Sequence, residues 1–220
     1  MSAPAAGLMK REYGPSLPAL LAPRWRAASR VTRVVAVLAG VALVAALVGA
    51  GLTLENATYS HGGPAPFSFE YRGLYRVRPE AGGYVRVQSR WPDGALKYSF
   101  AVAPLVLPPY DGDLTGEMPL YASGFIRSLS HTVAGFALRG EGKTKINNTL
   151  TGYEVAFFTL VEGREMYARD VLLTPAQAHP RAGVVVSMLT APGASAQVLS
   201  PLEVGEAGVL LRPLKSFAFD

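Results

Sequence analysis

The side chains best suited to catalysis or metal binding are few and scattered. Three histidines, His61, His131 and His179, are far apart, and no pair has the spacing of a metal-binding motif. The chain has no cysteine, which excludes thiolate metal sites, cysteine nucleophiles and disulfides. It also lacks a Gly-x-Ser-x-Gly nucleophile elbow, a phosphate-binding loop and a dinucleotide fingerprint. We assign no catalytic, cofactor-binding or metal-ligating residue, and we expect no cofactor and no enzymatic activity.

Charged clusters elsewhere in the sequence are interpreted as solvated surface. Asp111 and Asp113, with Glu117 nearby, offer oxygen ligands for calcium, but the third acid and the spacing of a calcium loop are missing. We expect a solvated acidic loop there. Four charges alternate in sign along one expected strand, and we expect cross-strand pairing on a water-exposed face for Arg164, Glu165, Arg169 and Asp170.

The net charge of +5 belongs to one end of the chain. Residues 1–33 contain six basic side chains and one acid, whereas residues 34–220 contain 15 of each. A neutral outer region offers no patch that could neutralise phosphates, so we expect no nucleic acid partner. Because prolines and glycines interrupt residues 1–33, we expect a disordered basic tail.

Next to this tail, residues 34–54 form a run of 21 residues without a charge. A helix of about 20 residues spans a bilayer core of about 30 Å. A cleaved signal peptide has a shorter basic start and an apolar run of about 7–15 residues, so a retained transmembrane helix is favoured. Basic residues stay on the cytoplasmic side, which places the N-terminus in the cytoplasm and the C-terminal domain outside. The expected localisation is the cell membrane, single-pass.

Residues 55–66 are expected to be a linker, and residues 67–220 an extracytoplasmic α+β domain. Phe67, Phe69 and Tyr71 alternate with polar residues, which is typical of a half-buried strand. Further strands are predicted at 84–89, 96–107, 136–139, 143–146, 153–161, 165–173 and 183–189, and a helix at 118–134 ending at Gly135. Strands, one helix, more strands and a final element at 209–219 predict an α+β sandwich with a mainly antiparallel sheet.

The order of these elements resembles the PsbP-like α/β/α sandwich superfamily, which includes the Lpq-type lipoproteins of mycobacteria and their actinobacterial relatives. The resemblance runs from about Pro66 to Asp220. It depends on the opening strand at 67–71, Gly135-Phe136, the hairpin from Gly152 to Arg164, and the closing 214–219 segment Leu-Lys-Ser-Phe-Ala-Phe. It implies a fold and a binding or accessory role, and it carries no catalytic residue to this chain. A transmembrane anchor here replaces the family's lipidated cysteine.

We therefore expect a membrane-anchored, non-catalytic binding protein, a subunit or partner of a larger membrane or cell-envelope assembly. Its expected partners are the membrane lipid bilayer and other membrane proteins, bound through the outer domain or the transmembrane helix. Small residues four apart in 34–54, such as Ala36 and Gly40, permit close helix packing. The alternative is a carrier of a lipid or other apolar ligand, with a cleft lined by Tyr121, Phe125, Phe157 and Phe158. A hydrolase with an unrecognised site is a third interpretation.

Overall fold

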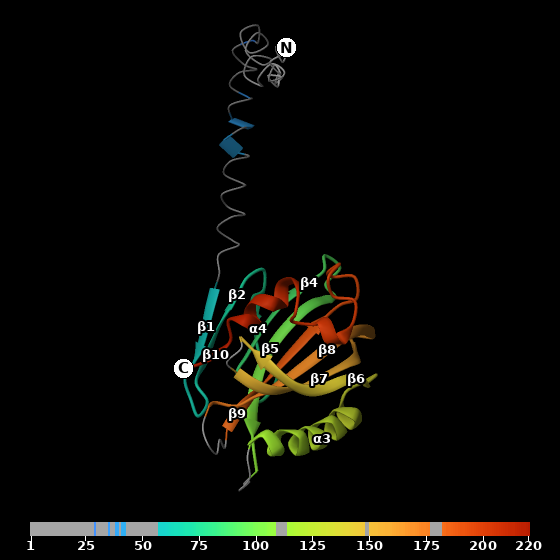
Figure 1. Ribbon diagram of the computed structural model, residues 1–220. Helices are drawn as coiled ribbons and strands as arrows, with labels where there is room; N and C mark the ends of the chain where they lie inside the picture. The colour runs from blue at the N-terminus through green and yellow to red at the C-terminus, as the bar shows by residue number, and fades with distance from the viewer. Residues whose placement is uncertain are drawn as a thin grey trace, which may run out of the picture. The chain divides into compact units, whose positions relative to one another are not determined.

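The computed structural model describes residues 57–108, 114–147, 150–176 and 182–220, together with 29, 35, 38, 39, 41 and 42 (Figure 1). The chain divides into two compact units, Met1–Thr53 and Leu54–Asp220. The expected tail and most of the expected span at 34–54 lie outside the described residues. Among the residues that are described, no helix is both long and apolar enough to cross a bilayer.

The second unit is built on an antiparallel sheet with strand order β3-β4-β5-β9-β8-β7-β6, counted over the described residues. The strands of this large sheet are β3 (Tyr75–Val77), β4 (Val85–Arg90), β5 (Leu96–Val106), β6 (Ala137–Ile146), β7 (Leu150–Val161), β8 (Arg164–Leu173) and β9 (Ala182–Thr190). Because β9 pairs between β5 and β8, the sheet joins the first half of the domain to the hairpin β7-β8.

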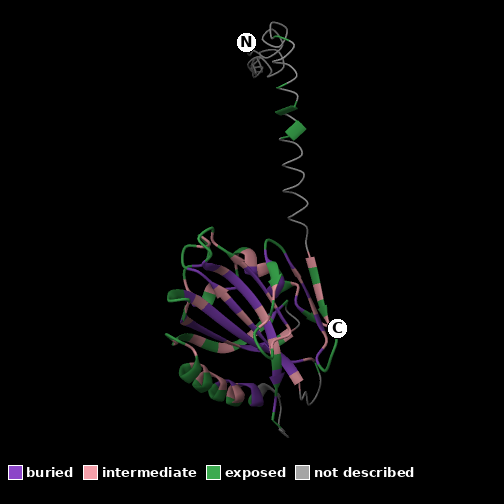
Figure 2. Ribbon diagram, turned by 180° about the vertical axis from the view of Figure 1, so that it is seen from behind, coloured by how far each residue is buried: buried purple, intermediate pink, exposed green. Residues whose placement is uncertain are grey.

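A layer covers each face of the large sheet, as the alternation of strand side chains requires. One face packs against helix α3 (Leu114–Thr132) through a core that includes Met118, Val155 and Leu172. The other face packs against the small sheet β1 (Ala57–His61), β2 (Phe67–Tyr71) and β10 (Ala218–Phe219), and against α4 (Leu211–Lys215). Two short 3-10 helices, η1 (Pro201–Glu203) and η2 (Gly208–Leu210), precede α4. Figure 2 shows buried residues along the strands and exposed residues on the outer side of α3.

The small sheet contributes an aromatic core. Phe67, Phe69 and Phe217 are fully buried, and the rings of Phe67 and Phe217 stack with centroids 5.3 Å apart. Aromatic side chains of this size each bury 150–250 Å², so the alternation seen at 67–71 faces the main core. The strand predicted there is confirmed.

The α+β class with mostly antiparallel strands is confirmed, as is the hairpin β7-β8, whose turn residues Glu162 and Gly163 both have positive φ. The helix ends before Gly135, whose φ of 67° is left-handed as expected, but it begins at Leu114. The expected start at 118 was based on the helical spacing of apolar residues from Leu120 onward, and the helix begins four residues earlier with Pro119 inside it.

Two strand predictions were wrong. The two strands predicted at 136–139 and 143–146, with a turn between them at Glu141-Gly142, form the single strand β6. Gly140 lies close to Leu202 there, and a Cβ at this position would lie 2.7 Å from Cδ2 of Leu202, so that side chain would have to move. The strand β1 lies inside the segment expected to be a linker; its pattern of half-buried and exposed residues gives a weak alternation signal.

Candidate functional site

A pocket of about 280 Å³ opens at the β4–β5 side of the large sheet. Its floor consists of Ala101 and Ala103 of β5 with Ser187 of β9, and one wall is the loop 79–83 before β4. Arg86 of β4 and Glu80 of the loop stand at its rim. The floor lies on the face of the sheet that α3 covers further along, and the small alanines leave the volume empty.

Strand pairing places polar groups in one row beneath this pocket. Arg86 pairs with Ala101, Ala101 with Ser187, and Ser187 with Asp170 of β8. Asp170 in turn pairs with Val155, which belongs to the α3 core. Residues paired across neighbouring strands lie on the same face, so the row runs from a half-buried arginine to a buried carboxylate.

Asp170 is 6% exposed, and its hydrogen-bond partner is the Ser187 hydroxyl. Burial raises the pKa of Asp170 to about 6, although the Ser187 hydrogen bond lowers it in part. Its neighbours along and across the sheet, Ala168, Leu172 and Val155, are fully buried. A carboxylate in such surroundings changes protonation within the pH range of living cells.

The protonation state of Asp170 decides what Ser187 presents to the pocket. When Asp170 is charged, the Ser187 hydroxyl donates to it, and the serine oxygen faces the pocket as an acceptor. When Asp170 is protonated, the carboxylic acid can donate to the serine oxygen, which frees the hydroxyl to donate into the pocket. The floor is therefore an acceptor above about pH 6 and can act as a donor below it.

Arg86 supplies the permanent positive charge at the rim. One of its terminal nitrogens donates to Glu80, whereas its Nε is buried and has no hydrogen-bond partner among the described residues. A buried donor without a partner is costly, so an acceptor on a bound molecule would stabilise this arginine. Guanidinium groups bind carboxylates and phosphates with two parallel hydrogen bonds.

On the opposite face of β8, Arg169 is 4% exposed; acceptors bind both of its terminal nitrogens, whereas its buried Nε has no hydrogen-bond partner among the described residues. It forms ion pairs with Glu154 of β7 and with Glu206, and it donates to the Val204 carbonyl oxygen at 2.9 Å. This network fastens the segment 203–206 to the sheet. Its role is structural, because Arg169 and the two glutamates that pair with it all belong to the same domain.

The structure does not bring the other candidate residues together. His61 packs against Tyr84 with tilted rings whose centroids are 4.0 Å apart, and His131 is exposed near the end of α3. Asp111, Asp113 and His179 lie outside the described residues. Glu117, expected in a solvated loop, is instead buried in the first turns of α3, and its Oε1 has no partner in the described part of the chain. No group of metal ligands occurs within the described residues.

The prediction of a water-exposed face was half correct. Glu165 is exposed, and Arg164 forms an exposed ion pair with Asp93. For Arg169 and Asp170 the prediction was wrong, because β8 is covered on both faces from Ala168 onward. The signal that could have revealed this is the apolar run Val171–Leu173 directly after them.

None of the four aromatic residues proposed for an apolar cleft lines the three pockets described for the residues that the structure covers. Tyr121, Phe125 and Phe157 pack in the core between α3 and the sheet. Phe158 lies on the other face, with its ring edge-on to Tyr167 at 5.5 Å and the Arg139 guanidinium 4.5 Å from its centroid.

No protein-family model and no curated protein matches the sequence. Solved structures resemble the fold at low identity. One is LpqN, involved in cell envelope biogenesis of Mycobacterium tuberculosis: 10% identity, TM-score 0.48, covering 75% of this chain and 91% of LpqN. Another is PA94, a Pseudomonas aeruginosa protein of unknown function: 13% identity, TM-score 0.35, covering 64% of this chain and 85% of PA94. These values do not establish a family, and membership of the PsbP-like superfamily stays a prediction.

Proposed function

We propose that this chain is a single-pass, membrane-anchored, extracytoplasmic binding protein of the PsbP-like type. It serves as a non-catalytic accessory subunit of a larger membrane or cell-envelope assembly. The apolar run at 34–54 supports the anchor, and the basic tail before it supports the orientation. The β4–β5 pocket is its recognition site.

One observation supports the recognition site: at the edge of the pocket, the buried Nε of Arg86 has no hydrogen-bond partner within the described ranges of the chain. The arginine and the Ser187 floor together suit a partner group with an anionic head and a hydroxyl or amide behind it. Such a pocket is small and has a charged residue and a hydroxyl among apolar lining residues, which fits a protruding side chain of a partner protein better than a long apolar chain.

The test uses the full-length chain in its own membranes, with a photo-reactive amino acid at Ala81 on the pocket wall. Exposed Lys145 on β6 is the control position. We expect one reproducible cross-linked partner from position 81 and none of the same mass from position 145. Arg86→Gln should reduce the adduct about tenfold, whereas the matched Arg127→Gln on α3 should not.

Two results would contradict the proposal. If gentle solubilisation after cross-linking yields only an isolated monomer, the chain is not a subunit of a larger assembly. If the amount of cross-linked adduct is unchanged in Arg86→Gln, the β4–β5 pocket is not the binding site of the partner. Extraction of the chain by alkaline carbonate would separately show that the anchor is wrong.

A further inference from the structure

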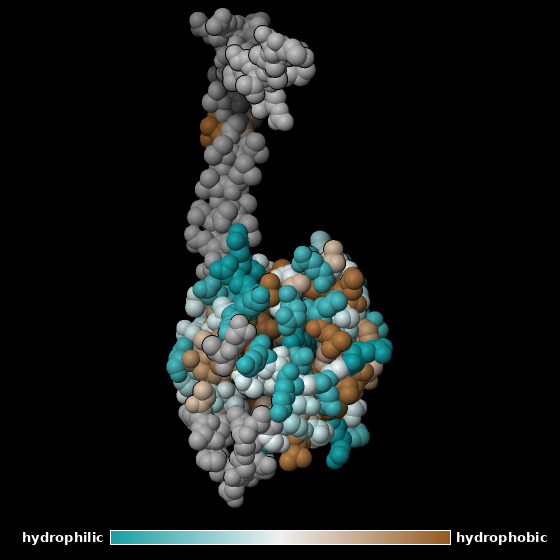
Figure 3. Space-filling model, in the orientation of Figure 1, coloured by the Kyte–Doolittle hydropathy of each residue, from teal (hydrophilic) through white to brown (hydrophobic). Residues whose placement is uncertain are grey.

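A second polar surface lies on the other side of the large sheet, where α4 packs against β2. Two adjoining depressions of about 380 and 460 Å³ share Gly208 and Arg212 as lining residues. Lys215 lines the first and Arg72 the second. We call Arg72, Arg212 and Lys215 the α4 basic surface. Figure 3 shows hydrophilic side chains gathered over β1, β2 and α4.

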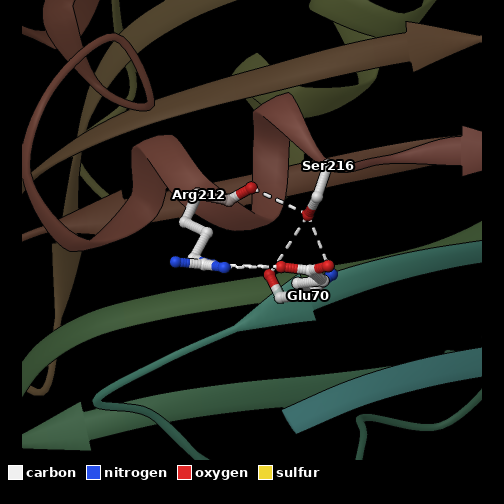
Figure 4. A network of polar contacts seen from close by, with 3 residues as sticks. All are labelled: Glu70, Arg212 and Ser216. Atoms are coloured by element: carbon white, nitrogen blue, oxygen red, sulfur yellow. Dashed lines mark hydrogen bonds and ion pairs between the residues drawn. The ribbon is translucent and has the colours of Figure 1, made fainter. Parts of the chain in front are cut away.

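A polar network fixes the geometry of this surface. Arg212 donates to Glu70 Oε2 from Nε at 3.2 Å and from a terminal nitrogen at 2.7 Å. The Ser216 hydroxyl, directly after α4, accepts from the Glu70 backbone N–H at 2.8 Å. Figure 4 shows Arg212 and Ser216 both facing Glu70. The network holds α4 on β2.

Glu70 neutralises only one of the three cations. Arg72 and Lys215 are exposed, and among the described residues neither forms an ion pair. Exposed Arg76 stands nearby, with its guanidinium 5.0 Å from the centre of the Tyr59 ring on β1. The surface therefore keeps an excess of positive charge, although residues 34–220 are neutral as a whole.

The chain itself limits how far this surface can be from a membrane. The predicted span ends at Leu54, and Ala57 begins β1 three Cα steps later, a reach of at most about 11 Å. Ala57 pairs with Tyr71, and Arg72 follows directly. The headgroup region extends about 5–7 Å beyond the hydrocarbon core on each side. With the span that we propose, the connection therefore keeps Ala57 within about 11 Å of its end, and Arg72 follows the strand partner of Ala57.

We infer that the α4 basic surface binds anionic phospholipid headgroups of the leaflet from which the chain emerges. The guanidinium of Arg72 and the ammonium of Lys215 contact the headgroup phosphates, while the Glu70–Arg212 pair holds the two cations apart. This inference depends on the membrane anchor of the proposed function, and it is independent of the β4–β5 pocket.

The lack of cysteine in the sequence makes a site-specific test direct. A single cysteine replaces Tyr75, three residues after Arg72, or Leu120 on α3 as the control; these side chains are 49% and 68% exposed. Each full-length variant is labelled with a fluorophore and reconstituted in phosphatidylcholine vesicles, with or without phosphatidylglycerol, that contain a headgroup-attached quencher.

We expect several-fold stronger quenching at position 75 than at position 120, only when phosphatidylglycerol is present, and weakened by high salt. Arg72→Ser with Lys215→Ser should lower the apparent affinity for the anionic surface by about tenfold or more. Arg127→Ser with Lys145→Ser removes the same charge from α3 and β6 and should leave the quenching unchanged.

Equal quenching at the two positions, or quenching that does not depend on phosphatidylglycerol, would overturn the inference while the anchor stands. If alkaline carbonate extracts the unlabelled chain, the chain has no transmembrane anchor, and the inferred contact with the headgroups is then also wrong. Loss of the pocket adduct in the cross-linking experiment affects neither result.

Discussion

Arg169 and Asp170 are neighbours in the chain and lie on opposite faces of β8, and their surroundings differ completely. Two carboxylates and a carbonyl oxygen surround the arginine. In the part of the chain that the structure describes, the Ser187 hydroxyl is the hydrogen-bond partner of the aspartate, whose other neighbours in the sheet are apolar. Both side chains are almost fully buried, so they differ in the charged and polar groups that surround them and not in how far they are buried.

This difference distinguishes a charged residue with a structural role from one with a functional role. A buried charge that is fully paired contributes order to the fold. A buried charge without a counter-ion lowers stability while it is ionised, and such groups gather at functional sites. The position of Asp170 behind the floor of the β4–β5 pocket is therefore the stronger indication of function.

The largest effect is expected from Arg169→Ala. Removal of the guanidinium leaves Glu154 partly buried without its counter-ion and releases the segment 203–206, so the free energy of unfolding should fall by about 3–5 kcal/mol. Urea denaturation at pH 7 measures it. Arg164→Ala removes an exposed arginine of the same strand as the control and should cost less than about 1 kcal/mol. Similar losses in both variants would show that Arg169 is not a structural anchor.

Asp170→Asn should act in the opposite direction. The folded pKa of about 6 lies above the ordinary value of 3.8, so ionisation of Asp170 disfavours the folded state above about pH 6. A shift of about two units corresponds to about 3 kcal/mol, which sets the upper bound of the gain at pH 8. For the native chain, this carboxyl raises stability as pH falls from 6 toward 4; the variant should lose that dependence. If Asp170→Asn is less stable than the native chain at pH 8, the ionised Asp170 does not destabilise the folded state.

Ser187→Ala should change the same titration by a smaller amount. The hydroxyl lowers the pKa of Asp170, so its removal should raise that pKa further and cost about 1–2 kcal/mol at pH 8. At pH 4 the cost should be smaller, because the carboxyl is then neutral. Carbonyl-carbon NMR of Asp170 follows the titration directly, and an unchanged midpoint would show that the serine does not solvate the carboxylate.

The smallest effect is expected at the exposed pair of Arg212 and Glu70. Arg212→Ala should lower the free energy of unfolding by less than about 1 kcal/mol, since both side chains are more than two-fifths exposed. High salt should reduce the difference further. A loss near that of Arg169→Ala would show that exposure does not separate the two networks.

Much of the fold follows from local patterns in the sequence. The alternation at 67–71, the hairpin of β7 and β8 and the helix ending at Gly135 each have a local signal in side-chain period or turn residues. The strand β6 has no such local signal, because its glycines resemble a turn. The proximity of Gly140 to Leu202, about 60 positions later, is not visible in the local sequence.

The candidate site could not be predicted in the same way. Its row of Arg86, Ser187 and Asp170 depends on β9 pairing between β5 and β8, and no local pattern contains that pairing. In β8 both faces are apolar beyond Ala168, so the period of two no longer tells which charge is buried. The sequence does contain the anchor signal at 34–54, which lies mostly outside the described residues.

The small sheet imposes an order on folding. Ala218 and Phe219 pair with Phe67 and Ser68, and the Ser68 hydroxyl donates to Asp220 at 2.8 Å over a separation of 152 positions. Loop closure over so many residues is slow compared with the hairpin β7-β8. A chain that emerges N-terminus first therefore holds β2 with one edge open until residues 218–220 arrive. Until that pairing forms, the open edge of the Phe67–Phe69 strand can pair with another chain.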